Sequence, residues 1–570
     1  MNKTEKLICL ILGGVLAWYL FVVQPRDAKA RAEYARAQAA AARSQEISEA
    51  QTEAQARKPV VEQFGTSAKP DTAAVQARVV PSVPEETVVL ENDELKLELS
   101  SWGGVVKNAT LKKYARNKGP VSDENPAVAL DFSAAPLGEL DGVSGLAPNA
   151  AYEVKERSTD KVVFANALAT RTVTLKPNYK VVFSESLGEA SGEVALSLGA
   201  MSMGSSKNDL LSVDSWALDA GKGKEGVIHH CEGDSPLKGY LVGGLSGGCS
   251  GSKSAAGLPS QARVQVAGAQ RWIAVKNRFF VTALASTTAA SRGFDATISR
   301  DTSATVYRPN SVAARALLSS GGSNAIESVF YVGPKKQALL WDLGMKDVME
   351  FGMWRWLCYP LVWVLNFFNS LIPNYGVAII LLTILVRLLF WPLTHKSTVG
   401  MKKMQEIQPL MKEIQAKYKD NPQRLQQETW ALYREKKVNP MSSCLPMLIQ
   451  IPVFIALFNV LRSAVELRYA PFLWIGDLSE PEALFAGWFP FGGLNLLPIL
   501  MAVSTGLQSA FTPSAGDKNQ QRMMMVFMPV MMLVMFYSFP SALSLYWFLS
   551  NIFSIVQMWL IRRKTAEKKV

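Results

Sequence analysis

The sequence predicts a membrane protein of several domains, with an all-α bundle of six transmembrane helices, five of them forming the core, and an all-β antiparallel sandwich outside the membrane. Six apolar segments are each close to the ~20 residues that cross the ~30 Å hydrocarbon core of a bilayer. Between the first and second of them, apolar and polar residues alternate with the period of two typical of β-strands. The net charge of +12 fits either nucleic acid or an anionic membrane surface, and its concentration in loops beside the spans favours the membrane.

The chain of 570 residues divides into segments of different composition. The expected segments are an inner N-terminus (1–6), an anchor helix (7–23), a tether (24–78), a β-sandwich (79–340), an interfacial helix (351–372), core spans at 374–394, 441–461, 494–512, 523–539 and 542–561, a basic inner hairpin (395–440), an outer loop (462–493), an inner loop (513–522) and a basic inner tail (562–570).

The first apolar run, Leu7–Val23, follows the short stretch MNKTEK. It fits a cleavable signal peptide with a weak cleavage site at Ala28-Lys29-Ala30, or a retained anchor helix. Its length favours the anchor, and in both cases the following chain is exported. Residues 24–78 are rich in Ala, Gln and charged residues without a steady apolar stripe, so we expect an exposed tether.

Residues 79–340 carry the strand pattern. Leu95, Leu97 and Leu99 alternate with charged residues, which is typical of a half-buried strand. Further strands are expected at Val162–Phe164, Thr170–Leu175, Lys180–Leu187, Val194–Leu198, Arg271–Val275 and Phe279–Ala285. Because Gly, Asn and Ser clusters separate these runs, we expect a large antiparallel sandwich. No serine elbow, phosphate loop or paired-carboxylate motif stands out, which favours a structural or docking domain over an enzyme.

Two histidines and two cysteines lie near one another in this domain. His229 and His230 precede Cys231, and Cys249 follows a glycine-rich stretch. Zinc accepts two His and two Cys, but the spacing fits no common site, and adjacent histidines point to opposite faces of a strand. A disulfide between Cys231 and Cys249 is the better interpretation, because an exported domain lies in an oxidising compartment. We therefore expect no metal site.

The charges of the second half predict its topology. Residues 396–440 carry ten Lys/Arg and five Asp/Glu, and short basic loops stay on the inner side. If Phe351–Ile372 crossed the membrane, this loop would lie outside, so we expect Phe351–Ile372 to be an interfacial helix. The tail RRKTAEKKV is also basic, which places both termini inside.

The basic inner loop has a helical pattern. Its apolar residues recur at spacings of three and four: Met404, Ile407, Met411, Ile414 and Tyr418. The pattern resumes after Pro422, so the sequence predicts two helices in an antiparallel hairpin, the first kinked by Pro409. Such a hairpin can meet lipid headgroups or ribosomal RNA.

The remaining spans are free of charge. The charge-free stretch of the third, Val438–Leu461, contains Gln450 and three prolines at 440, 446 and 452, and prolines are tolerated in a span when neighbours satisfy the freed carbonyl groups. Residues 523–561 are too long for one span, so we expect two short helices with a turn at Pro540-Ser541. Seven methionines in the first of these fit ordinary apolar filling or an adaptable surface for many apolar partners.

One charge interrupts the second span. Arg387 is the only charged residue from Trp356 to Thr394, and an isolated charge at the centre of a span costs roughly 2.5–3.5 kcal/mol. In one interpretation, its side chain reaches along the helix to the inner interface. In the other, it is the fixed positive charge of a water-filled pocket, with Thr383 one turn earlier on the same helix face.

Several stretches resemble the YidC family of membrane protein insertases. The most specific are KKVNPMSSCLPMLIQIPVFIALF from Lys436 to Phe458, VELRYAPFLWIGDLS after it, LLTILVRLLFWPLT around Arg387, and MPVMMLVMFYSFPSALSLYWFLSNIFSIVQ in the last two spans. The exterior domain matches more weakly, at LENDELKLELSSWGG, RWIAVKNRFF and YVGPKKQALLWDL. A domain of this size resembles the Gram-negative form of the family, which has a large periplasmic domain.

The resemblance implies a protein of the bacterial inner membrane with a hydrophilic groove in the inner leaflet. Arg387 would be the charge of this groove, Thr383 and Gln450 its polar neighbours, and Tyr546 and Trp547 aromatic contacts for the substrate. The implied partners are nascent and small membrane proteins as clients, the Sec translocon, the ribosome near the inner loops and tail, and the lipid bilayer. The resemblance implies no cofactor.

Two other functions stay open. A secondary transporter would use Arg387 to bind an anionic solute, although no repeated halves are visible in the sequence. A carbohydrate-active enzyme outside the membrane would leave five further spans unexplained.

Overall fold

A computed structural model gives the fold and describes residues 81, 83–188, 192–202, 211–219, 224–230, 261–300, 309–349, 351–419, 421–436, 438, 445–485, 493–511 and 523–567. The described residues divide into two compact units. Among the described residues, the first unit contains Leu385–Pro392, a stretch of helix α6 (Tyr375–Glu406). The second unit contains the sheets and the remaining helices.

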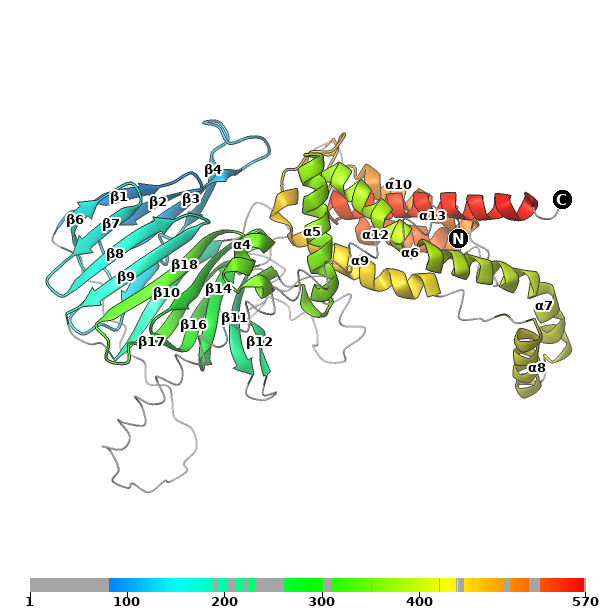
Figure 1. The fold of residues 1–570 in the computed structure, drawn as a ribbon, viewed down its shortest axis with the longest axis horizontal. Coiled ribbons are helices and arrows are strands. Elements are labelled where there is room, and N and C mark those ends of the chain that lie inside the picture. Colours follow the sequence, from blue (N-terminus) through cyan, green and yellow to red (C-terminus); the bar gives the residue numbers. More distant parts are fainter. Residues whose placement is uncertain are drawn as a thin grey trace, which may run out of the picture. The chain divides into compact units, whose positions relative to one another are not determined.

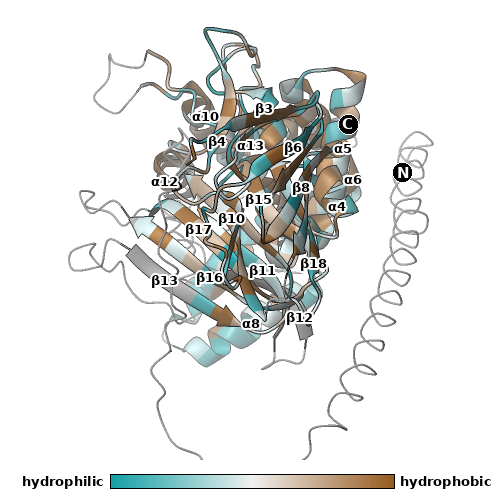
Figure 2. Ribbon diagram, turned by 90° about the vertical axis from the view of Figure 1, so that its left-hand side faces the viewer, coloured by the Kyte–Doolittle hydropathy of each residue, from teal (hydrophilic) through white to brown (hydrophobic). Residues whose placement is uncertain are grey.

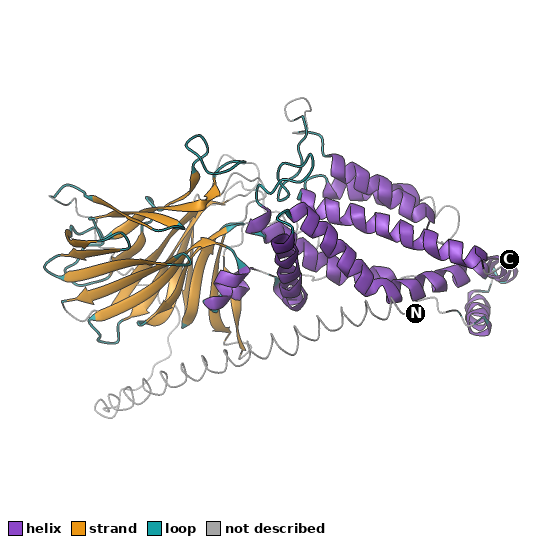
Figure 3. Ribbon diagram, turned by 45° about the horizontal axis from the view of Figure 1, so that its top comes forward, coloured by secondary structure: helices purple, strands orange, loops and turns teal. Residues whose placement is uncertain are grey.

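The exterior part consists of two antiparallel sheets, drawn in orange in Figure 3. The strand order of the first described sheet is β1 (Thr87–Glu91), β2 (Leu95–Ser100), β3 (Val105–Ala115), β5 (Leu137–Asp141), β10 (Glu193–Ser202), β17 (Pro309–Ser319), β16 (Ala290–Arg300) and β13 (Gln261–Ala267), with β4 (Ala127–Asp131) paired to β3. The order of the second is β12 (Lys224–His230), β11 (Ser212–Asp219), β14 (Gln270–Lys276), β15 (Phe280–Thr287), β18 (Ala325–Pro334), β9 (Lys180–Leu187), β8 (Ala169–Lys176), β7 (Lys161–Ala165) and β6 (Glu153–Arg157).

The strand pattern read from the sequence is confirmed. Leu95, Leu97 and Leu99 of β2 are fully buried, whereas the residues between them are partly exposed. The other expected strands coincide with β7, β8, β9, β10, β14 and β15, although β15 begins at Phe280, one residue later than expected. The expected all-β antiparallel domain is therefore present.

The helices follow the sheets in the chain, as the colours of Figure 1 show. They are α4 (Gln337–Asp342), the 3₁₀ turns η2 (Lys346–Met349) and η3 (Gly352–Trp354), α5 (Arg355–Leu371), α6, α7 (Gln408–Lys417), α8 (Pro422–Glu435), α9 (Leu445–Ser463), the 3₁₀ turn η5 (Val465–Leu467), α10 (Leu496–Phe511), the π-helix η6 (Met523–Phe527), α12 (Met528–Phe536) and α13 (Ser541–Glu567).

Two of the described helices are long and apolar enough to cross a membrane, Tyr375–Glu406 and Ser541–Leu560. Shorter apolar helices occur at Gln450–Ser463, Leu496–Phe511 and Met525–Phe536. Figure 2 shows the apolar character of α12 in brown. The expected count of six transmembrane helices therefore remains a prediction.

Helix α5 has two different faces. Cys358, Leu361 and Leu365 are buried, and the Cys358 thiol lies 3.6 Å from the carbonyl oxygen of Ala456 in α9. Trp356 and Phe367 are exposed. This division is typical of a helix that packs on protein with one side and meets another apolar medium with the other.

The structure corrects one expectation about the inner hairpin. Pro409 does not kink a helix, because it stands in the first turn of α7, where its missing N–H has no partner to lose. The two helices pack as expected, and the Tyr433 hydroxyl lies 3.4 Å from Met411 Sδ. Helix α6 continues beyond Thr394 to Glu406, and α13 continues to Glu567. The bounds of the span, the hairpin and the tail remain predictions, because a transmembrane helix can extend beyond the membrane.

Several expectations concern residues outside the described ranges. These are the anchor helix (7–23), the tether (24–78), the disulfide between Cys231 and Cys249, and the inner loop (513–522).

Candidate functional site

Helix α6 carries the charge that the sequence singles out. The helix begins after Asn374, whose side-chain oxygen accepts a hydrogen bond from the Val377 amide at 3.2 Å. Arg387 lies within it and is half-buried. Thr383, one turn earlier, is fully buried, and its hydroxyl donates to the Ile379 carbonyl at 2.7 Å. The Thr383 hydroxyl therefore bonds to its own helix.

Gln450 of α9 and Tyr546 of α13 meet. The Gln450 side-chain amide lies 3.4 Å from the Tyr546 hydroxyl and 3.3 Å from the Ser550 hydroxyl. Tyr546 and Ser550 are buried, and Gln450 is half-buried. Because Tyr546 and Ser550 are four residues apart on α13, one amide spans one turn of the partner helix.

Trp547 belongs to an aromatic cluster. Its ring centroid lies 4.9 Å from Phe454 of α9, nearly perpendicular to it, and 5.5 Å from Phe536 of α12. Phe536 in turn lies 5.0 Å from Phe539. Such edge-to-face pairs add about 0.5–1.5 kcal/mol beyond area burial. The cluster therefore joins α9, α12 and α13.

The structure also shows a row of buried polar residues of which only Tyr546 was expected from the sequence. The polar seam of α13 consists of Tyr546, Ser550, Asn551, Ser554 and Gln557, all buried.

Two members of the polar seam contact further helices. Asn551 donates to the hydroxyls of Ser504 at 3.0 Å and Thr505 at 2.8 Å, both in α10. Gln557 donates to the Thr394 hydroxyl of α6 at 2.9 Å. Polar residues that recur every three or four positions in a charge-free stretch, as at 546, 550, 554 and 557, are the sequence signal that could have revealed the seam.

Family comparisons agree with this architecture. The family model described as 60Kd inner membrane protein matches residues 367–569, and the model of the YidC periplasmic domain matches residues 250–364. The chain belongs to the YidC family.

Curated relatives are named as membrane protein insertases. The "Membrane protein insertase YidC" of Syntrophobacter fumaroxidans is 42% identical over 300 residues, which are 51% of this chain and 53% of the relative. The protein of that name from Syntrophus aciditrophicus is 45% identical over 238 residues, 41% of this chain and 42% of the relative. The chain spans about half the length of the curated relatives it matches.

A solved structure of the family also matches. The crystal structure described as an active YidC insertase with the first transmembrane domain resolved is 18% identical. The match has a TM-score of 0.34 and covers 82% of this chain and 91% of that chain.

In this YidC-family chain, the chemistry of the site is hydrogen bonding between neutral groups. Within the described residues, no group of three or more His, Cys, Asp or Glu is placed to hold a metal ion. Hydrogen bonds between neutral side chains of membrane helices contribute about 0.6 kcal/mol each on average. These contacts can therefore hold α9, α10 and α13 together and offer polar groups.

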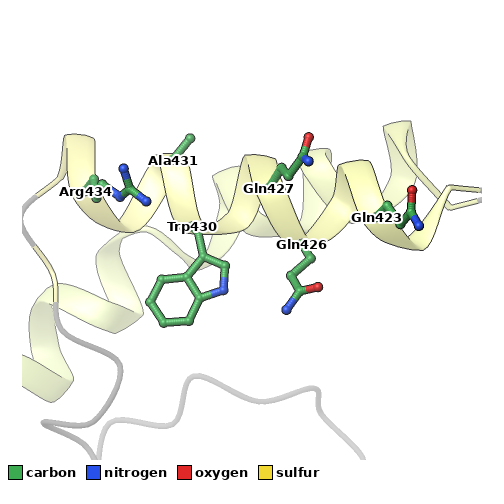
Figure 4. A pocket seen from close by; sticks show the side chains of 6 residues that line it. All are labelled: Gln423, Gln426, Gln427, Trp430, Ala431 and Arg434. Carbon is green, nitrogen blue, oxygen red and sulfur yellow. The ribbon is translucent and has the colours of Figure 1, made fainter.

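A shallow hollow lies elsewhere in the YidC-family chain, on helix α8. Figure 4 shows the side chains that line it, all from that helix: Gln423, Gln426, Gln427, Trp430, Ala431 and Arg434. Trp430 is 51% exposed. Because all of these residues lie on α8, the hollow belongs to the surface of the basic hairpin. None of them was expected in the groove.

Proposed function

We propose that the protein is a membrane protein insertase and chaperone. It transfers segments of client proteins into the inner membrane, alone or with the Sec translocon, through a hydrophilic groove of the inner leaflet that contains Arg387. The single observation that carries this proposal is a half-buried arginine in the part of α6 from Tyr375 to Thr394, which holds no other charged residue, in a YidC-family chain. The insertase names of the relatives support it.

The proposed groove lowers the free-energy cost of moving a client segment across the bilayer. A client segment that crosses the bilayer must bring polar groups out of water, at a cost of several kcal/mol for each unpaired group. A hydrated groove through the inner leaflet removes part of that path. Gln450, Tyr546 and Thr383 are its proposed polar neighbours, and Trp547 is a proposed apolar contact for the client.

Arg387 supplies the charge. A fixed positive charge holds an acidic client tail transiently in the groove. The transmembrane potential then draws the tail outward, at about 2.3 kcal/mol per charge per 100 mV. In this mechanism, the protein needs no cofactor and forms no covalent bond with the client.

The short fifth span supports the same mechanism. Among the described residues, the helical stretch η6 with α12 runs from Met523 to Phe536. At 1.5 Å per residue this is about 21 Å, less than the ~30 Å of the hydrocarbon core. A short span thins the bilayer around it, which shortens the remaining path for the client.

The other surfaces are assigned to partners. The basic hairpin α7–α8, with its exposed Trp430, faces the cytoplasm and meets the ribosome or lipid headgroups. The exposed apolar side of α5 lies in the outer interface of the bilayer. Both chain termini are then cytoplasmic, and the β-rich domain is periplasmic.

Insertion into defined vesicles tests the function. Purified protein is reconstituted into vesicles without other proteins, and a small client with a short exterior segment is added. We expect the exterior segment to become protected from external protease only in vesicles that contain the protein. Equal protection in protein-free vesicles would contradict the proposal.

A further inference from the structure

We infer that Arg278, in the turn between β14 and β15, is a positioning residue for the helical site. It holds the outer ends of α9 and α13 at the separation at which Gln450 meets Tyr546. The effect of this contact on client insertion rests on the proposed function, whereas the geometry does not.

Arg278 is 3% exposed, and its guanidinium reaches three groups outside the β-rich domain. Nε donates to the Arg462 carbonyl in the last turn of α9 at 2.8 Å, and Nη2 donates to the Ser479 carbonyl at 2.6 Å. Nη1 forms an ion pair with Glu480 at 2.5 Å. A planar fork of N–H donors suits three fixed acceptors, which a lysine ammonium on a flexible stem matches less well.

The same short segment bonds to the start of α13. The Glu480 carbonyl accepts hydrogen bonds from the Ser541 amide at 3.0 Å and from the Ser541 hydroxyl at 2.6 Å. The Leu478 carbonyl accepts from the Ala542 amide at 3.0 Å. The first amides of a helix have no acceptor within it, so these carbonyl groups cap α13 from outside.

Arg278 therefore lies between two helix ends. On one side it caps the carbonyl end of α9, and on the other it fixes the segment that caps the amide end of α13. These are the two helices that contribute Gln450 and Tyr546. An arginine at this point has the geometry to set their spacing.

A second contact fixes the same outer loop to the β-rich domain. Arg468 donates to the Ala115 carbonyl at 2.8 Å and the Arg116 carbonyl at 3.1 Å, at the end of β3. Asp477 ties the loop to itself, because its carboxylate accepts from the amides of Tyr469 at 3.0 Å and Ser479 at 2.8 Å. The loop that receives Arg278 is thus held at both ends.

The contacts of Gln450 are sensitive to such positioning. Its distances of 3.4 Å and 3.3 Å to Tyr546 and Ser550 are near the upper limit of a hydrogen bond. Helices transmit a displacement of their ends along their length, since their packed faces are rigid. A small shift at Arg462 or Ser541 is therefore enough to separate these groups.

Cross-linking in the full-length protein tests the inference. Cysteines replace Gln450 and Ser550 in a background without the native cysteines, and the rate of disulfide formation is measured in membranes. We expect Arg278→Gln to slow it by about tenfold to a hundredfold, the scale of one lost charge-assisted hydrogen bond. Arg278→Lys should restore part of the rate.

The matched control is Arg315→Gln. Arg315 also pairs with acidic residues, Glu139 and Asp141, but within the β-rich domain, so its replacement should leave the rate unchanged. Ser541→Ala, which removes one bond at the α13 end, should slow the rate less than Arg278→Gln and covers the case in which Arg278→Gln does not fold. An unchanged rate in both Ser541→Ala and a folded Arg278→Gln protein would overturn the inference.

Client insertion is measured separately in the Arg278 variants with native Gln450 and Ser550. Slower cross-linking together with slower insertion supports the inference and its link to the function. Slower cross-linking with unchanged insertion supports the positioning role and contradicts the link to the proposed function.

Discussion

The β-rich domain and the helical region bury polar groups in different ways. In the domain, Arg171 is 1% exposed and pairs with Glu185 at 2.8 Å, and the buried Lys276 pairs with Asp214. Among the described contacts of the helical region, Gln450, Asn551 and Gln557 bond to hydroxyl groups. A buried ion pair is tolerable where additional fixed groups surround it. In lipid, neutral pairs are cheaper than charged ones, and the role proposed for the charge of Arg387 is a functional one.

Removing one partner of a buried ion pair in the β-rich domain should have the largest effect on stability. Arg171→Ala leaves Glu185 buried without its partner, and the Gly103 carbonyl without the donor at 2.6 Å. We expect a loss of about 3–5 kcal/mol in the stability of the domain. The measurement uses the full-length protein and follows proteolysis of the β-rich domain at increasing temperatures. Arg157→Ala, at an exposed position of β6, is the control, and an equal loss in both variants would contradict this account.

Removing a hydrogen bond between neutral side chains of the helical region should destabilise the protein less. Asn551→Leu keeps most of the side-chain volume but removes the bonds to Ser504 and Thr505. We expect the free energy of unfolding, measured with SDS in mixed micelles, to fall by about 1–2 kcal/mol. Ile552→Ala, at a position 37% exposed, should change it less. A loss as large as that of Arg171→Ala would show that the two regions do not differ.

The outer loop offers a smaller effect that depends on pH. Burial raises the pKa of the Glu482 carboxyl above its ordinary 4.5, although the amides of Leu496 and Leu497 at the start of α10 act in the opposite direction. Compared with the unfolded chain, the folded loop therefore favours the neutral form of Glu482. The contribution of Glu482 to the stability of the loop is fully present below pH 4.5 and is lost as the pH rises through the higher folded pKa.

Amide hydrogen exchange of residues 478–485 measures this effect. We expect protection to decrease as the pH rises through that window, after correction for the intrinsic exchange rate. Glu482→Gln should flatten the profile. A wild-type profile already as flat as that of the variant would contradict the prediction.

Period-two alternation and charge-free stretches were enough to predict much of the fold. The leucines of β2 alternate strictly, whereas β16 and β17 are rich in small residues such as Ala and Ser, which lack a clear apolar period. Those strands are defined by pairing with each other along their whole length. The full length of α6 could not be predicted, because the helix continues past His395 into polar sequence, where hydropathy no longer reports helix length.

The site was predicted in part. Gln450 and Tyr546 come together as polar groups of facing helices, and the aromatic contacts of Trp547 are clear. The partners of Asn551 depend on the angle between α10 and α13, which local sequence does not encode. The role of Arg278 depends on contacts between residues roughly 200 positions apart, as its separation of 202 from Glu480 shows.

The central claim is that Arg387 acts in client insertion through its charge. The measurement is insertion of one client with an acidic tail into vesicles that carry wild type, Arg387→Lys, Arg387→Ala, Arg387→Glu or the neighbouring control Leu388→Ala, at matched protein levels. We expect Lys to keep much of the activity, Ala to lose most of it, Glu to be worst, and the control to match wild type. Equal insertion by wild type and Arg387→Ala across several clients would contradict the claim and reduce Arg387 to a side chain that reaches the interface.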